Sequence, residues 1–270
     1  ADFNTAVGFG SLGFDQLGSK TTAIGFRALG TQRPTTATDT FNTAVGYDAG
    51  LEVTTGVNNT LIGGVAGDAL TEGAQNVALG VGALTSDTLG SKSVAIGNFS
   101  LEAQNFTTAT DSNNTAVGYA AGNDITTGTL NTLIGSLAGD ALTVGNSNTA
   151  LGQGALSSDT KGDTSVAIGV LALNDQNFTT STDVYNTAVG AFAGEKITTG
   201  VNNTLIGGLA GDALTTGTDN DAIGVSALSS DTAGNRSTAI GRGTLNAQNF
   251  TTSTSVYNVA VGYLAGLSVT

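Results

Sequence analysis

The stretch Asn114-Thr115-Ala116-Val117-Gly118 decides the fold, because close copies of it return along the whole chain. The copies most like it end at Gly46, Gly118, Gly190 and Gly262, which are equally spaced in the sequence. Between them the pentapeptide recurs at a constant shorter interval, except that one interval in four is longer, as between Gly169 and Gly190. A unit this short cannot bury a core alone, so the pattern predicts a solenoid in which each coil packs on its neighbours.

The pentapeptide itself predicts a short strand that ends in a tight bend. Its third position is Ala in most coils and its fourth is always Val, Ile or Leu. Neighbouring strand residues point to opposite faces, so both faces are apolar. One face can pack into its own coil, whereas the other needs a second sheet or a second chain. The closing Gly fits a bend or a close backbone approach.

The first position of the pentapeptide is usually Asn, and stacked coils would bring these side chains into line. The amides can then form a ladder of hydrogen bonds between coils, although a simple turn-forming Asn is the alternative. In the four pentapeptides that end at Gly46, Gly118, Gly190 and Gly262, these asparagines are Asn42, Asn114, Asn186 and Asn258.

The residues after each closing glycine read Gly-x-x-Ala-(Leu/Gly), which we interpret as a turn into a second short strand. The last of these positions alternates between two leucines and two glycines, as in Gly50 and Gly67 followed by Leu84 and Leu101. The sequence offers no reason for this pairing.

The remainder of each coil is polar and rich in turn residues, as expected for an arc that faces solvent. Every fourth arc is longer, and at about 4.8 Å per coil these long arcs would form ridges roughly 19 Å apart. An exposed Phe on such a ridge could stack on a sugar ring, or it could tuck under its own loop. The candidate ligand-binding residues on the ridges are Gln104, Asn105, Phe106, Gln176, Asn177, Phe178, Gln248, Asn249 and Phe250.

Composition narrows the chemistry. The chain has 8 basic and 21 acidic residues and a net charge of -13, which disfavours nucleic acid as a partner. It has no His, the commonest general base, and no Cys, which would supply a thiolate nucleophile or metal ligand. Asp68 and Asp87 recur with the longer period of the repeat, which favours a solvated acidic face over paired catalytic carboxylates or a calcium site. We therefore predict no enzyme activity, catalytic residue, metal or cofactor.

Residues 1–270 read as a single repetitive segment. No apolar run approaches the roughly 20 residues that span a bilayer, so we expect no membrane insertion of this segment. The opening Asp2-Phe3-Asn4 matches junctions such as Thr40-Phe41-Asn42 that elsewhere follow a whole coil, and the last unit stops midway. We expect the segment to be an excerpt of a longer fibrous chain.

Two strings resemble repeats of known fibrous proteins. Ser93-Val94-Ala95-Ile96-Gly97 and Ser165-Val166-Ala167-Ile168-Gly169 resemble the head repeats of trimeric autotransporter adhesins. The string that runs from Asn114 to Gly122 is similar to repeats of bacteriophage tail fibres. The resemblance covers essentially the whole chain. It implies a left-handed parallel β-roll, three chains side by side, and display at a cell or virion surface, outside the cell, for attachment.

Three functions remain open at this stage. The leading hypothesis is a structural and attachment module, a homotrimeric fibre segment that contacts a surface glycan or a protein receptor. The second is an ice-binding solenoid, suggested by threonine pairs such as Thr54-Thr55 and Thr126-Thr127. The third is a passive spacer or filament without a ligand. The fold expected for all three is an all-β parallel solenoid of about fifteen coils.

Overall fold

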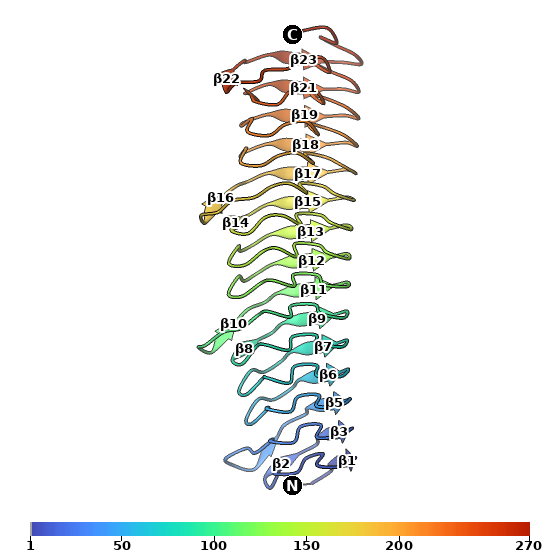
Figure 1. Ribbon diagram of the computed structural model, residues 1–270, viewed down its shortest axis with the longest axis vertical. Coiled ribbons are helices and arrows are strands. Elements are labelled where there is room, and N and C mark those ends of the chain that lie inside the picture. Colours follow the sequence, from blue (N-terminus) through green and yellow to red (C-terminus); the bar gives the residue numbers. More distant parts are fainter. Residues whose placement is uncertain (1) are drawn as a thin grey trace. The chain divides into compact units, whose positions relative to one another are not determined.

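The protein is an all-β parallel solenoid, as the repeat predicts. The computed structural model describes residues 2–270, and within that range fifteen three-residue parallel strands occur and no helix does. The chain forms two compact units, one ending at Asn131 and the other spanning Thr132–Thr270. Within each unit the three-residue strands stack one above another, one per coil (Figure 1).

The three-residue strands all coincide with positions two to four of the pentapeptide. In the first unit they are β1 (Thr5–Val7), β3 (Thr22–Ile24), β5 (Thr43–Val45), β6 (Thr60–Ile62), β7 (Val77–Leu79), β9 (Val94–Ile96) and β11 (Thr115–Val117). In the second unit they are β12 (Thr132–Ile134), β13 (Thr149–Leu151), β15 (Val166–Ile168), β17 (Thr187–Val189), β18 (Thr204–Ile206), β19 (Asp221–Ile223), β21 (Thr238–Ile240) and β23 (Val259–Val261).

Hydrogen bonds between equivalent residues of neighbouring coils give the length of each coil. The bond from the Asn59 backbone to Asn42 joins residues that are 17 residues apart, the length of an ordinary coil. The bond from Arg27 to Asp48 crosses a coil with a long arc and joins residues that are 21 residues apart. The two intervals of the sequence repeat are therefore the two coil lengths of the fold.

Each long arc adds a two-residue strand that pairs, in parallel, with one in the preceding coil. In Figure 1 the arcs that carry β10, β16 and β22 project beyond their neighbours. The pairs are β2 (Gly18–Ser19) with β4 (Thr38–Asp39), β8 (Gly90–Ser91) with β10 (Thr110–Asp111), β14 (Gly162–Asp163) with β16 (Thr182–Asp183), and β20 (Gly234–Asn235) with β22 (Thr254–Ser255).

Strict register places equivalent residues of successive coils directly over one another. In β5 and β6, for example, Ala44 pairs with Leu61 and Val45 with Ile62. The third positions face inward and form the inner row, Ala in most coils and Leu in Leu61, Leu133 and Leu205, with side chains 0% exposed between β3 and β21. The inside of a coil is therefore narrow, and small side chains fill it.

The closing glycines mark the closest approach of one coil to the next. Gly46 has φ +146°, and a Cβ placed on it would lie 2.3 Å from the carbonyl oxygen of Gly63. A side chain there would meet backbone, which cannot move aside without breaking the register. Only Gly fits, which explains why every copy of the pentapeptide ends in this residue.

The prediction of a second short strand after each Gly-x-x-Ala is wrong. These residues form turns, and two of them adopt left-handed backbone, as at Val65 (φ 52°) and Leu84 (φ 55°). Left-handed residues curl the chain tightly, so the Ala and Leu side chains reach the interior from a turn rather than from a strand.

The paired leucines and glycines have a packing reason. A Cβ on Gly50 or Gly67 would come within 2.6 or 2.8 Å of the Leu61 side chain, so these glycines make room for the larger inner residue. Three residues further on, the same coils carry the buried Val53 and Leu70. Coils that carry Leu instead of Gly at the position of Gly50 and Gly67 have Asp or Gln three residues further on. Each block of four coils therefore alternates between an apolar interior and one with a polar pair.

Candidate functional site

The long arcs do not present their Gln and Phe side chains to solvent. Gln104, Gln176 and Gln248 are 0% exposed, Phe106 and Phe178 are buried, and Phe250 is half-buried. Of the nine ridge candidates, the exposed ones are Asn105, Asn177 and Asn249, whose side-chain oxygens accept hydrogen bonds from Thr88, Thr160 and Thr232. The Phe side chains thus follow the alternative reading, packing under their own loops.

Gln104 belongs to a buried polar cluster. Its Nε2 donates to Asp87 Oδ2 at 2.6 Å and to Ser93 Oγ at 2.8 Å, and its Oε1 accepts from Asn114 Nδ2 at 2.9 Å. Asp87 Oδ1 also accepts from the backbone N–H groups of Gly90 and Phe106. A carboxylate only accepts, so Asp87 fixes which end of the Gln104 amide donates.

The same cluster overturns the expectation that the periodic aspartates form a solvated face. Asp87, Asp159 and Asp231 are 0% exposed. Burial raises the pKa of the Asp87 carboxyl above its ordinary value, while the hydrogen bonds from Gln104 and from the backbone act in the opposite direction. These carboxylates satisfy donors inside the coil, so their role is structural.

The asparagines of the pentapeptide form the predicted ladder, but mostly with backbone. Asn42 Oδ1 accepts from the backbone N–H of Asn59 at 2.9 Å, and Asn42 Nδ2 donates to the carbonyl of Gly56 at 2.8 Å. The equivalent Asn186 likewise accepts from the backbone N–H of Asn203 and donates to the carbonyl of Gly200. Each amide therefore links its own coil to the next one.

The outward face of the strands combines an aliphatic row with a threonine row, and much of it is exposed. Position four of the pentapeptide forms the outer aliphatic row, in which Ile24, Leu79, Ile134, Leu151, Ile206, Ile223 and Ile240 are 37–44% exposed. Position two forms the outer threonine row, which is mostly Thr, with Val in some coils and the exposed Asp221 in one. The residue after the closing Gly adds further exposed apolar groups, such as Tyr47, Val81 and Val225. Contiguous exposed apolar surface of this kind marks an interaction site.

A third feature is the residue that immediately precedes each pentapeptide, where the chain turns toward the strand; it is exposed in every coil except that of the half-buried Thr164. We call these residues the corner row. They are Phe3, Lys20, Phe41, Asn58, Gln75, Lys92, Asn113, Leu130, Ser147, Thr164, Tyr185, Asn202, Asp219, Arg236 and Tyr257. All of them have left-handed backbone, with φ between 50° and 62°. Residues other than Gly, Asn and Asp adopt this conformation at a cost of about 1–2 kcal/mol each.

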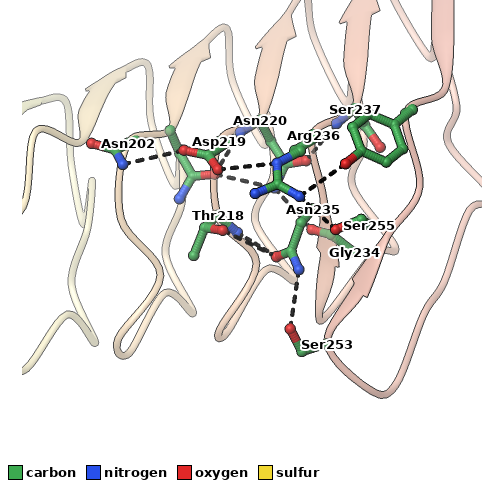
Figure 2. Close-up of polar contacts among 12 residues, drawn as sticks. Asn202, Thr218, Asp219, Asn220, Gly234, Asn235, Arg236, Ser237, Ser253 and Ser255 are labelled. Carbon is green, nitrogen blue, oxygen red and sulfur yellow. Dashed lines mark hydrogen bonds and ion pairs between the residues drawn. The ribbon is translucent and has the colours of Figure 1, made fainter.

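In the second unit, neighbouring corner residues contact one another through their side chains (Figure 2). Asn202 Nδ2 donates to Asp219 Oδ1 at 3.2 Å, and Asp219 Oδ2 lies 3.6 Å from Arg236 Nε. Arg236 Nη1 donates to the Tyr257 hydroxyl at 3.1 Å and to Ser255 Oγ at 2.7 Å. The guanidinium also lies 5.5 Å from the centre of the Tyr257 ring. The four corner residues thus form one exposed polar and aromatic strip.

The first unit has a similar group around Lys20. Its ammonium lies 2.7 Å from Asp39 Oδ2 and 5.1 Å from the centre of the Phe41 ring. In the next block Lys92 pairs with Asp111 at 2.6 Å. The corner row therefore carries cations that are matched by nearby carboxylates.

A shallow groove of about 380 Å³ lies over the first coils, lined mainly by Phe9, Phe14, Arg27, Leu51 and Glu52. It exists because Gly13 and Gly30 stand where later coils carry larger side chains. Within residues 2–270 no group of three or more acidic residues has the geometry to hold a metal ion, and no helix there is long and apolar enough to cross a bilayer.

Neither comparison with known proteins found a relative. No protein-family model matches this chain, and no curated protein matches it.

The corner row is the functional candidate that the repeat pattern conceals. Its members differ in residue type from coil to coil, so a search for one repeated residue passes over them. The signal is positional, because a variable residue directly precedes the first position of every pentapeptide, which is Asn in most coils. The buried Asp87 and Gln104 could have been recognised too, since they lie one ordinary coil length apart in the sequence.

Proposed function

We propose that this chain is a structural and attachment module of a cell-surface or virion fibre, in which three copies associate side by side. The observation that carries the proposal is the outer aliphatic row, in which several Ile and Leu side chains are more than a third exposed although they point away from the core. At about 25 cal/mol per Å² of apolar surface removed from water, covering such a face would stabilise an assembly substantially. The resemblance to adhesin-head and tail-fibre repeats favours the same conclusion.

The repetition supports a role in extension and display. Successive coils add the same strand and, in most cases, a buried amide and a close glycine contact, so length can grow without a new core. An elongated surface fibre needs these properties. The surface it contacts would be a glycan or a protein receptor outside the cell or virion.

The association is tested by charging the outer aliphatic row. We expect Ile206→Asp with Ile223→Asp to convert the trimer to monomers, because each would place like charges into a dry contact. Size-exclusion chromatography with light scattering measures the mass, and circular dichroism checks that the β-fold persists. Thr216→Asp, which adds a charge on an exposed arc, is the control and should leave the mass unchanged. A double variant that keeps the wild-type oligomer would contradict the proposal.

Attachment is tested separately, with fluorescently labelled wild-type protein on a panel of bacterial and animal cells. Saturable binding to at least one cell type supports an attachment module. A stable trimer that binds no cell type would instead indicate the passive spacer.

One observation favours ice binding as a second candidate. The outer threonine row and the outer aliphatic row lie side by side on a regular parallel sheet, with about 4.8 Å between coils. A flat, regular array of Thr and aliphatic side chains could order water. Side-by-side association would cover this surface, so the two functions exclude each other. Thermal hysteresis at micromolar protein would favour ice binding, and its absence would favour the fibre.

A further inference from the structure

The corner row keeps side chains where the backbone favours glycine. The two other left-handed positions of each coil are Gly in some coils, for example at Gly82 and Gly67, and another residue, such as Val65 or Leu84, in the rest. The corner positions never do, although the chain contains 40 glycines. They instead carry Phe, Tyr, Lys, Arg, Leu and Thr, residues that this conformation disfavours. A strained backbone, kept in the coils whose corner residue is neither Asn nor Asp, favours a role for these side chains.

The scaffold beneath these side chains is rigid. The backbone N–H groups of Asn202, Asp219 and Arg236 donate to carbonyls of the preceding coil at 2.9, 3.1 and 3.0 Å. The next residue in each case is the buried Asn or Ser of the pentapeptide. The corner side chains therefore project from fixed points at a regular spacing, which lowers the entropy lost when they bind a ligand.

The chemistry of the row fits an uncharged, hydroxyl-rich ligand. Aromatic rings at Phe41, Tyr185 and Tyr257 are 53–64% exposed and offer apolar faces. Amides, a carboxylate and a guanidinium beside them offer planar donors and acceptors. The cations are already matched by Asp39, Asp111 and Asp219, so an anionic ligand gains little from them.

We propose that the part of the corner row within each unit binds a neutral polysaccharide, with the pyranose rings lying along that part of the row. This rests on the proposed attachment function and places the ligand on a surface distinct from the outer aliphatic row. A pyranose has an apolar C–H face that stacks on aromatic rings and an equatorial belt of hydroxyls that pairs with amides and carboxylates. The coil spacing of about 4.8 Å is close to the length of one pyranose unit. The strip from Asn202 to Tyr257 is the most complete copy of the site (Figure 2).

The test replaces the aromatic corner residues by the amide that the row itself uses. Phe41→Asn with Tyr185→Asn and Tyr257→Asn removes three rings and keeps the fold, because Asn occupies the same position at Asn58, Asn113 and Asn202 with the same backbone. Asn also tolerates left-handed backbone better than Phe or Tyr, so we expect an unchanged or higher melting temperature. Phe14→Ser, which removes an exposed ring outside the row, is the control.

Binding is measured by affinity electrophoresis in native gels that contain mannan, dextran, galactan or arabinoxylan, with heparin as the anionic comparison. We expect at least one neutral polysaccharide to retard the wild type and the Phe14→Ser control equally. The triple variant should bind at least tenfold more weakly at the same oligomeric mass. Full binding by the triple variant, or retardation by heparin alone, would overturn the proposal.

The outcomes separate this inference from the attachment function. If no neutral polysaccharide retards the wild type while the labelled protein still binds cells, the corner row is not a glycan site and the attachment function stands. If neither polysaccharides nor cells bind, both proposals fail.

Discussion

The two faces of each three-residue strand differ, because in most coils the larger apolar side chain faces outward and the smaller one faces the interior. On β18, Leu205 points inward and is fully buried, whereas the adjacent Ile206 points outward and is 39% exposed. In most coils the inner residue is only Ala, and the larger Val, Ile or Leu faces out. A soluble monomer has no reason to keep its larger apolar side chains on the exposed face of a sheet. The difference supports the proposal that copies of this chain pack against the outer face.

The largest effect that tests this difference comes from truncating neighbours on one strand. Leu205→Ala should lower the free energy of unfolding by about 2–5 kcal/mol, because it leaves a cavity inside the coil. Ile206→Ala should cost a single chain far less and should weaken its association instead. Chemical denaturation at low and high protein concentration separates the two. Equal, concentration-independent losses for both variants would mean that the faces are not different.

A second prediction concerns the polar part of the interior. Gln104→Glu places a second carboxylate against Asp87, where Gln104 now donates at 2.6 Å. Two buried like charges repel, so we expect a loss of about 3 kcal/mol at neutral pH that diminishes once either group is protonated. Urea denaturation at pH 7 and pH 4 measures it. Asn105→Asp adds the same charge at the exposed neighbouring residue and should cost little. A loss of equal size at both pH values would contradict the buried-cluster assignment.

The contact between coils gives a third prediction. Gly46→Ala forces a Cβ against the Gly63 carbonyl in a left-handed conformation and should cost about 2 kcal/mol or more. Gly64→Ala is a matched control, because a Cβ there meets nothing within 4 Å. Thermal melting of both variants provides the comparison. Similar melting temperatures for the two would show that the coils are further apart than described.

The smallest predicted effect is on pH dependence. Burial, together with the nearby Asp48 charge, raises the pKa of Asp68, whereas the hydrogen bond from Thr85 opposes the shift. The folded chain therefore holds this proton more tightly than the unfolded chain, whose pKa is about 3.9. The stability from this group is present below that pH and is lost as the pH rises through the raised pKa.

Asp68→Asn should accordingly flatten the change in melting temperature between pH 4 and pH 7. The exposed Glu72→Gln removes the same charge and is the control. If both variants flatten the profile equally, general charge repulsion, rather than the buried carboxyl, causes the pH dependence.

Much of the fold follows from the sequence, because a single pentapeptide sets the strands, the register and the number of coils. The repeat pattern did not predict that Asp87 and Gln104 face inward, because a polar residue in a turn-rich arc is more often solvated. Their separation by one ordinary coil length was the available clue. Gln104 and Phe106 suggested a ligand site because the arc is long. The structure instead uses the extra length to pack these side chains inside.

The corner row could not be predicted from repetition, because its residues have nothing in common except their backbone. Thr164 and Tyr185 look like ordinary loop residues in the sequence. Their left-handed φ angles, 61° and 53°, distinguish them only in the folded chain. Likewise, the two apolar positions of each strand were evident, but which of them faces inward depends on the narrow interior that the turns create.

The central claim is that copies of this chain cover the outer aliphatic row. The most direct measurement is the mass of the native protein by light scattering coupled to size-exclusion chromatography. The account predicts a single species of three times the 26.5 kDa chain mass, stable to dilution. A species of 26.5 kDa at every concentration, with the β-fold intact by circular dichroism, would contradict it.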